Sequence, residues 1–433
     1  MRTSRLRVAA VVAAVTMLAT GCGSGTPESD GTPKSAETAD SAGGLSGELT
    51  FANWQWLETG RGDAIWDAVT QYEAVNDGVT MKQLAVPYKD YPGTMKAQMG
   101  AQGGPDILIL TDVNYAEMAA AGLLEPLDGV LPSELEANLN ATNEGAIYEG
   151  TRYGYAWEVV NYALIWNKAL LAEAGVEPPT DMQSFVDAAV AVTEATGNPG
   201  FAARHQMNEE AAWWEDFSNW PYGFGGGWSE DGKLTIDTEE NIAAVQAFKD
   251  MYDSGAMAIG DDASTFRTKF AEGKIGMLID NSSVALTVTT DNPVLSGDDI
   301  GTSALPFPTP NATHSVMYLA VNAYSENKEL AEDWLRWFYT QDAQEAVAAG
   351  LAPSSIGTNA AMPAEFLSAN PWVDTYTAQA EFTRSSAIKG FEEQFPEISH
   401  IVMGEIEKVL VSDADPSEAL AKAQADAEAI ANS

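Results

Sequence analysis

Residues 104–110, Gly-Pro-Asp-Ile-Leu-Ile-Leu, are the stretch that decides the fold. Four consecutive apolar residues, Ile107 to Leu110, follow a proline and an aspartate, a pattern typical of a short parallel strand buried on both faces. A helix is expected next, through residues 116–121, because Gly122 can end it. The stretch therefore predicts one strand followed directly by one helix.

The same alternation extends toward the N-terminus. Residues 47–52 and 79–84 have the length and composition of short strands, and residues 62–72 between them carry apolar side chains at helical spacing. Strand, helix and strand in this order predict βαβ units, and so an α/β fold. Three further helices are expected: one from a cap at residues 237–240 to Gly255, one over 328–339 and one over 416–430.

The composition limits the possible partners. The 433 residues include 22 basic and 63 acidic side chains, which give a formal net charge of −41. Nucleic acid is excluded as a partner because phosphate binding needs a basic surface, and direct binding to anionic lipid is disfavoured for the same reason. With 45% apolar residues and this length, the chain is expected to build two lobes.

The N-terminus carries an export signal. Three arginines precede the apolar run from Val8 to Ala19, and small residues lead to Cys22, which is the single cysteine of the chain. Residues 23–47 are polar and rich in glycine and serine, as a tether is. Ala19-Thr20-Gly21-Cys22 resembles the lipobox of a bacterial lipoprotein, which implies removal of residues 1–21, lipidation of Cys22 and a tether over 22–46. A plain secretory signal with a chance cysteine is the alternative.

Common catalytic and metal motifs are absent from the sequence. His205, His314 and His400 lie far apart, and the HExxH, CxxC, GxSxG, GxxxxGK[ST] and GxGxxG patterns do not occur. No metal, no cofactor and no catalytic residue is therefore expected. A secreted glycan hydrolase stays open as an alternative, because 63 acids always allow a carboxylate pair.

Aromatic residues are the most informative side chains. The chain has 12 tryptophans, and several stand in polar or glycine-rich segments that we interpret as loops. Flat apolar rings with a polar edge suit sugar rings, although core packing is the simpler role for any one of them. The rings concerned are Trp54, Trp56, Trp157, Trp213, Trp214, Trp220, Tyr222, Phe224 and Trp228.

Several segments together resemble one family. The chain is similar to the sugar-binding, extracellular solute-binding proteins of ATP-binding-cassette importers, the family that includes maltose-binding protein, in order from about residue 47 to the C-terminus. The segments that carry the resemblance are residues 104–109 with 121–128, Tyr155-Ala156-Trp157 with 165–171 and 174–180, residues 270–281, 327–331 and 351–354.

The resemblance implies a periplasmic-binding-protein-like α/β fold of two lobes, joined by several hinge crossings, with the ligand in the cleft. Lobe 1 would comprise residues 47–155 and about 316–350, and lobe 2 about 156–315 and about 351–433. A carbohydrate ligand, permease subunits as partners, a lipid anchor in the cell membrane and a monomeric chain are what it leads us to expect.

The family's ligand-facing positions can be carried over to this chain. One departure is Asn281-Ser282-Ser283, where many relatives have Gly-Pro-Trp, so we hypothesise that Trp213, Trp214, Trp220 and Tyr222 supply the missing ring. The positions expected to bind ligand are Asn53, Trp54, Gln55, Trp56, Thr111, Asp112, Tyr115, Trp157, Glu158, Trp213, Trp214, Tyr222, Phe224, Gly225, Gly226, Asn281, Ser282, Met317, Tyr318 and Pro353.

A cationic or amino-bearing ligand is the alternative. Acids stand beside the proposed rings, and an acid next to an aromatic ring can hold a cation. The acids concerned are Glu58, Glu158, Glu209, Glu210, Glu215 and Asp216.

Overall fold

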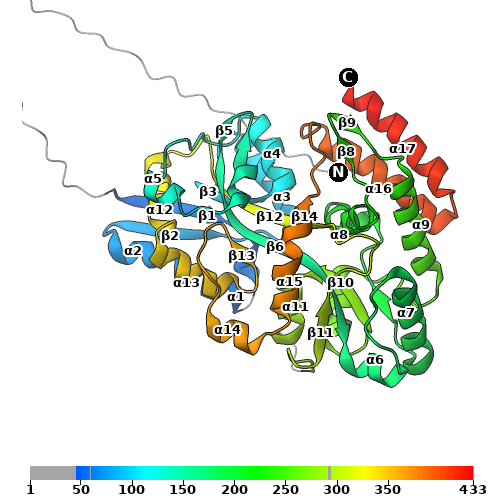
Figure 1. The fold of residues 1–433 in the computed structure, drawn as a ribbon. Helices are drawn as coiled ribbons and strands as arrows, with labels where there is room; N and C mark the ends of the chain where they lie inside the picture. Colours follow the sequence, from blue (N-terminus) through cyan, green and yellow to red (C-terminus); the bar gives the residue numbers. More distant parts are fainter. Residues whose placement is uncertain (1–44, 59, 291–293, 433) are drawn as a thin grey trace, which may run out of the picture. The chain divides into compact units, whose positions relative to one another are not determined.

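The computed structural model describes residues 45–58, 60–290 and 294–432, so the signal and Cys22 lie outside the described residues (Figure 1). Ten strands in this part form a sheet with the central order β2-β1-β3-β12-β6-β10-β7; β11 and β13 pair with β6, and β14 pairs with β12. The sheet strands are β1 (Gly47–Ala52), β2 (Val79–Leu84), β3 (Ile107–Thr111), β6 (Gly154–Asn167), β7 (Phe201–Ala202), β10 (Met277–Asn281), β11 (Ile300–Ser303), β12 (Ala312–Val321), β13 (Ser355–Ile356) and β14 (Thr383–Ser385). Two small hairpins pair β4 (Ile147–Tyr148) with β5 (Thr151–Arg152) and β8 (Ser229–Glu230) with β9 (Lys233–Leu234).

Strand β6 belongs to both halves of the sheet. Its residues 154–161 pair with β12, and its residues 162–167 pair with β10 and β11. In Figure 1 the strand runs as one long ribbon through the middle of the described part. One continuous strand therefore carries the chain from the first half of the sheet to the second.

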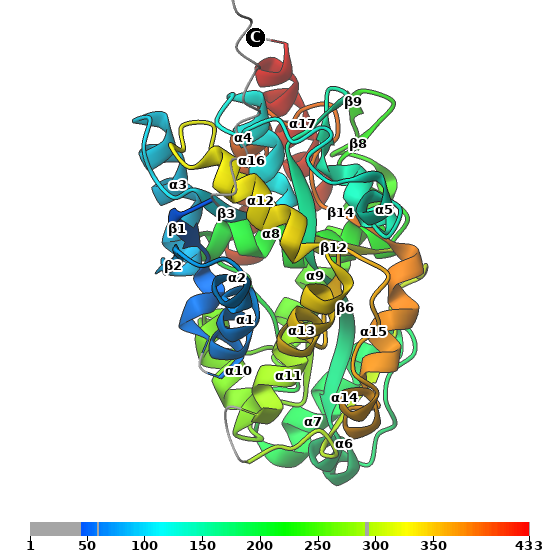
Figure 2. The same ribbon diagram turned by 90° about the vertical axis from the view of Figure 1, so that its left-hand side faces the viewer.

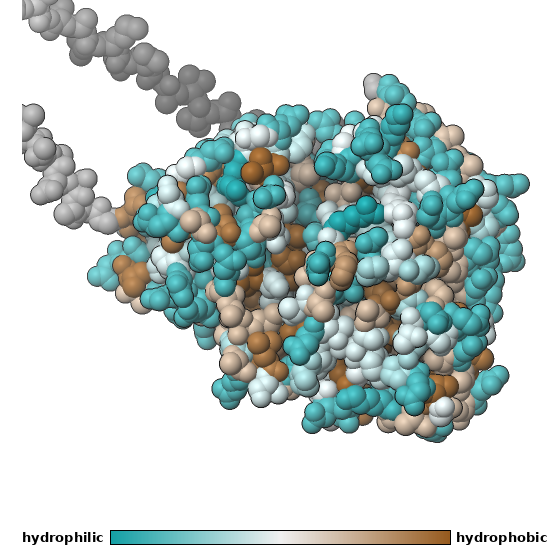
Figure 3. Space-filling model, viewed as in Figure 1, coloured by the Kyte–Doolittle hydropathy of each residue, from teal (hydrophilic) through white to brown (hydrophobic). Residues whose placement is uncertain are grey.

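Helices cover both faces of the sheet (Figures 1 and 2). They are α1 (Arg61–Val69), α2 (Gln71–Val75), α3 (Tyr91–Gly100), α4 (Asp112–Ala120), α5 (Ser133–Glu136), α6 (Lys168–Ala174), α7 (Met182–Thr196), α8 (Glu210–Gly223), α9 (Glu239–Asp253), α10 (Ala263–Ala271), α11 (Ser282–Thr290), α12 (Lys328–Phe338), α13 (Gln341–Leu351), α14 (Ala364–Ala369), α15 (Val373–Gln379), α16 (Phe395–Ser412) and α17 (Pro416–Ala431). Within the described ranges, none of them is both long and apolar enough to cross a membrane. Hydrophilic residues cover most of the face shown in Figure 3, in keeping with the acidic composition.

The strand that decides the fold is buried on both faces, as predicted. Ile107 and Ile109 pack into one apolar core, and Leu108 and Leu110 pack into another on the opposite face. The strand is parallel to β1 but antiparallel to β12, so the expected parallel environment is only half correct. The predicted strands 47–52 and 79–84 are confirmed, and the register between them is parallel.

The predicted helices are confirmed with shifted ends. The helix expected over 62–72 is two helices, α1 and α2, because the Thr70 hydroxyl bonds to the carbonyl of Trp66 at 2.8 Å and the backbone turns there. The helix expected over 116–121 already begins at Asp112. Helices α9, α12 and α17 match the three later predictions, and the Thr238 side chain caps α9.

The loop interpretation of the tryptophan-rich segment was wrong. Trp213, Trp214 and Trp220 lie on α8, a helix whose apolar residues recur at helical spacing and pack into the core against α9 and α16. Two other expected loop rings also have regular surroundings: Trp157 lies on β6, and Trp54 begins the 3-10 helix η1 (Trp54–Leu57). The glycines that follow α8 led us to expect a loop over the whole segment, but the helical spacing of its apolar residues makes residues 210–223 a helix.

Candidate binding site

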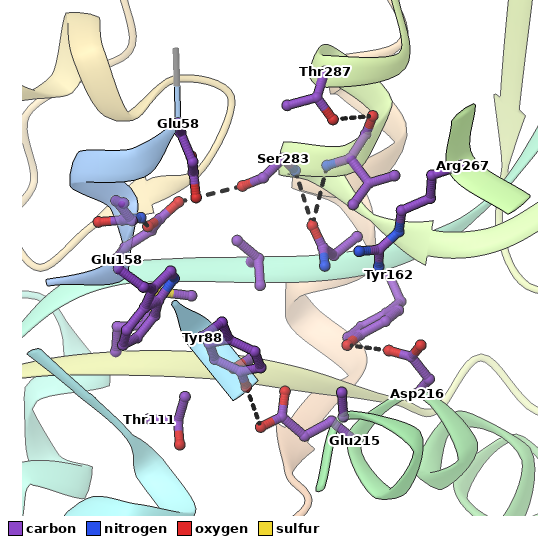
Figure 4. Close-up of a pocket in the computed structure, with 18 of the residues that line it drawn as sticks. Glu58, Tyr88, Thr111, Glu158, Tyr162, Glu215, Asp216, Arg267, Ser283 and Thr287 are labelled. Carbon is purple, nitrogen blue, oxygen red and sulfur yellow. Dashed lines mark hydrogen bonds between the residues drawn. The ribbon is translucent and has the colours of Figure 1, made fainter. Parts of the chain in front are cut away.

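A cavity of about 390 Å³ lies against the middle of β6 and β12, at the ends of β3 and β10, and among the helices beside them. Its lining mixes ionised groups, rings and small apolar side chains, several of which appear in Figure 4. The lining residues are Trp54, Gln55, Glu58, Arg61, Tyr88, Thr111, Glu158, Val160, Tyr162, Arg204, Ala212, Glu215, Asp216, Arg267, Asn281, Ser283, Val284, Thr287, Ser315 and Met317.

One end of the cavity is built on Glu158, which is fully buried on β6. Arg61 contacts Oε1 at 2.5 Å, Ser283 donates to the same atom at 3.3 Å, and Ser354 and Gln55 donate to the carboxylate as well. Gln55 is itself fixed, because its Oε1 accepts from the Trp157 indole at 2.9 Å. The Glu158 carboxylate is therefore fully satisfied by the protein.

The other end is built on two consecutive acids of α8, Glu215 and Asp216, both nine-tenths buried. Asp216 accepts from Tyr162 at 2.8 Å and forms an ion pair with Arg204. Glu215 accepts one side-chain bond in the described structure, from the Tyr88 hydroxyl at 3.4 Å (Figure 4). Burial, together with the nearby Asp112 and Asp216 carboxylates, raises the pKa of Glu215 to about 8.

Rings and fixed polar groups line the space between these ends. The Trp54 ring is half-buried and packs edge-on against Tyr88 and Tyr91, with ring centroids 5.1 and 5.0 Å away. Asn281 Oδ1 accepts from the backbone N–H groups of Ser283 and Val284, so the start of α11 holds its side chain. The cavity thus offers one indole, two phenols and several orienting polar atoms to a ligand.

A second cavity, of about 530 Å³, contains four other predicted residues: Asp112, Tyr115, Tyr222 and Tyr318. The Asp112 carboxylate accepts from the Ser385 hydroxyl, its Oδ1 atom is buried without a hydrogen-bond partner in the described structure, and burial raises its pKa to about 6. Thr111 lines the first cavity and the next residue lines the second, so the two spaces lie on either side of the end of β3.

The remaining predicted residues line neither cavity. Trp157, Trp213 and Trp214 are core residues; Trp157 stacks on Phe338, and the Trp214 indole donates to the Ser386 carbonyl at 2.9 Å. Their role in binding remains a prediction. The other positions of this group are Asn53, Trp56, Phe224, Gly225, Gly226, Ser282 and Pro353; of these, Asn53, Trp56 and Ser282 are buried and Phe224 packs on Phe307.

The basic residues of the cavity, Arg61, Arg204 and Arg267, had not been predicted. Arg267 forms two bonds of 2.8 Å to Asp280, as the other two pair with Glu158 and Asp216. Arg61 and Glu158 are 97 positions apart in the sequence, so the spacing of residues gives no sign that they form a pair. The composition offered one usable signal. Basic residues are rare, with 22 against 63 acidic residues, so each arginine is expected to form an ion pair with an acid. Within the described ranges, no group of three or more His, Cys, Asp or Glu side chains could hold a metal ion.

Comparison with known sequences matches the chain to one protein family. The family model described as bacterial extracellular solute-binding protein matches residues 55–345. Diacetylchitobiose binding protein DasA of Streptomyces coelicolor is 24% identical over 77% of this chain and 77% of its own length. Binding proteins of Brucella abortus and Brucella suis are 24% identical over 54% of this chain, which spans only 57% of their length.

Comparison with solved structures concerns the fold. The GacH receptor of Streptomyces glaucescens, solved unliganded and with acarbose, superposes with a TM-score of 0.78 over 90% of this chain and 99% of that one, at 22% identity. Maltose-bound MalE3 of T. maritima superposes with a TM-score of 0.75 at 20% identity. These likenesses confirm the predicted two-lobed, binding-protein-like α/β fold.

Proposed function

Because this chain belongs to the bacterial extracellular solute-binding protein family, we propose that it captures a carbohydrate, from a mono- to an oligosaccharide, and delivers it to the permease of an ATP-binding-cassette importer. The observation that carries the proposal is the mixed lining of the first cavity. Rings lie beside carboxylates and guanidinium groups that are held in place by other side chains.

Sugar rings need this combination. Their C–H faces pack on flat apolar rings such as Trp54, while their hydroxyls donate to carboxylates and accept from guanidinium groups. The names of relatives add support, since a diacetylchitobiose binding protein and a maltotriose-binding protein align with the chain at 24% and 25% identity. Because Thr111 and Asp112 line different cavities, an oligosaccharide could extend from the first space into the second.

We propose that binding involves closure of two lobes and no chemical conversion. Lobe 1 comprises residues 47–155 and about 316–350, and lobe 2 about 156–315 and about 351–433; the switch of β6 from one set of partner strands to the other supports this division. A ligand that binds the closed form more tightly shifts the chain toward it, and the permease recognises that form.

The family places the protein outside the cytoplasm. We further propose that it is a monomer anchored to the cell membrane by lipid on Cys22, because two acyl chains suffice for stable anchoring where one is marginal. Cys22→Ser should release the protein from the membrane fraction into the medium. Retention of that variant in the membrane would contradict the anchor and leave the ligand proposal intact.

The test of the ligand is thermal unfolding of the full chain in detergent against a panel of probes. The panel contains glucose, maltose, maltotriose, diacetylchitobiose, glucosamine, spermidine and choline. A ligand at 100 times Kd stabilises the folded protein by about 2.7 kcal/mol, a clear rise in Tm. A rise in Tm with neutral sugars supports the proposal, and a rise with the cations alone replaces it with a cation-binding function. Chromatography of the sugars after incubation tests the hydrolase alternative, because a hydrolase would release a shorter sugar.

A matched pair of variants tests the site. Trp54→Ala should weaken sugar binding by up to about tenfold, since contacts of an aromatic ring contribute about 0.5–1.5 kcal/mol. The control is Trp66→Ala, which removes an indole that packs on Trp56 and lies outside both cavities. An equal loss of affinity in both variants would argue against direct contact with Trp54.

A further inference from the structure

Glu215 and Asp216 are consecutive acids in one cavity, but the protein supplies them unequally with hydrogen-bond donors. Asp216 receives the Tyr162 hydroxyl at 2.8 Å and the Arg204 guanidinium. Arg204 also contacts Glu209 at 3.4 Å, whereas the ion pairs of the described residues include none to Glu215. From the side chains that the structure describes, Glu215 receives only the long bond of 3.4 Å from Tyr88.

We infer that Glu215 meets the ligand as a neutral carboxylic acid that donates its proton to a ligand oxygen, whereas its neighbour Asp216 is held by Arg204 and Tyr162. The inference rests on the proposed function, because it assigns a role to Glu215 in binding that ligand. It names a chemical requirement for the ligand as well: an oxygen with a free lone pair must lie opposite Glu215.

The groups around Glu215 explain why it keeps the proton. The Asp112 carboxylate at the start of α4 and the Asp216 carboxylate beside Glu215 on α8 both repel a second negative charge on Glu215. Tyr88 from the 3-10 helix η2 (Tyr88–Asp90) and Tyr162 from β6 are neutral phenols. The Arg204 guanidinium acts in the opposite direction and favours the charged form of Glu215, but it is already bound by Asp216 and Glu209.

Burial acts in the same direction. Glu215 is 8% exposed, and the cost of ionising a buried carboxyl that forms no ion pair among the described residues, together with the two neighbouring acids, raises its pKa to about 8. Near neutral pH the side chain therefore carries a proton on one oxygen and keeps acceptor capacity on the other. An ionised carboxylate could only accept, so the two states select different ligand atoms.

The pH dependence of binding tests the inference. The full chain is titrated calorimetrically, at pH 6.5 and at pH 9.5, with every neutral sugar of the panel. We expect binding about thirtyfold weaker at pH 9.5, because 1.5 units above a pKa of about 8 only about one molecule in thirty keeps the proton. A ligand with an ammonium group opposite Glu215 would instead draw the proton off, and would bind more tightly as the pH rises.

Two variants separate a role of Glu215 from a general effect of alkali. Glu215→Gln should bind a few-fold more weakly at pH 6.5, because an amide N–H replaces the acid O–H, yet show no fall up to pH 9.5, so that it binds more tightly than the natural chain there. Glu210→Gln removes an acid from the same helix that pairs with His400 at 2.7 Å, outside the cavity, and should keep the alkaline fall.

Each other outcome has a distinct meaning. If the natural chain binds a sugar with equal affinity at both pH values, or if Glu215→Gln retains the alkaline fall, the inference is wrong and the proposed function stands. If no sugar of the panel binds at either pH, the proposed function fails and this inference fails with it. The natural chain alone decides the first case, so the test does not depend on a variant that folds.

Discussion

The two ends of the cavity use the same chemical group in opposite ways. At one end the Glu158 carboxylate accepts hydrogen bonds from Arg61, Gln55, Ser283 and Ser354. Its charge is therefore compensated within the protein. At the other end Glu215 is also buried, but among the described residues it has one weak hydrogen-bond partner, Tyr88. The difference shows that burial alone does not reveal the role of an acid. The number of hydrogen-bond donors around it does, because a buried acid with few donors from the protein can still bond to a ligand.

The largest effect is expected from breaking the end of the cavity built on Glu158. Glu158→Ala should destabilise the protein by about 3–5 kcal/mol, because it leaves the Arg61 charge buried without its partner on β6. Urea unfolding monitored by tryptophan fluorescence measures the loss. The double variant Arg61→Met/Glu158→Leu should recover much of it, and a loss below 1 kcal/mol for Glu158→Ala would show that Glu58 alone suffices for Arg61.

A smaller effect is expected at Asp216, at the other end of the cavity. Asp216→Asn should cost about 2 kcal/mol, since the hydrogen bond from Tyr162 and the ion pair with Arg204 weaken while Glu209 still contacts Arg204. The same denaturation experiment reports it. If the variant is as stable as the natural chain, the bonds of Asp216 to Tyr162 and Arg204 do not stabilise it, and the contrast with Glu215 loses its basis.

Glu215→Gln should raise stability instead, in a manner that depends on pH. The pKa of Glu215 lies near 8 in the folded chain, against 4.5 as its ordinary value, so its contribution is complete below pH 4.5 and is lost as the pH rises through 8. The variant has no such loss and should melt a few degrees higher at pH 8.5, with the gain vanishing toward pH 4.5. Glu210→Gln is the control, and a gain independent of pH would refute the assignment.

The smallest effect is expected from Ser283→Ala. Its hydroxyl lies 3.3 Å from Glu158 and 3.1 Å from Ser354, but Glu158 retains three other donors. We expect a loss of at most about 1 kcal/mol in chemical unfolding. A loss comparable with that of Glu158→Ala would mean that the Glu158 carboxylate depends on every donor.

Local patterns predicted the strands and most helices because apolar spacing and caps are properties of neighbouring residues. Ile107 to Leu110 alternate between two cores as their run suggested. The site was only partly accessible to such reasoning. Trp54, Glu158 and Asn281 were carried over from a family and line the cavity, whereas Arg61 reaches Glu158 across 97 positions, a pairing that only the folded sheet creates.

Strand β6 has a consequence for how the molecule comes apart. Its 14 residues pair with β12 on one side of Asn161 and with β10 and β11 beyond it, so neither half of the sheet can lose its order without releasing a strand from the other. A chain of 433 residues with two lobes would ordinarily melt in separate steps. Here a calorimetric scan should show one cooperative transition, with the amides of β6 exchanging with solvent last of all.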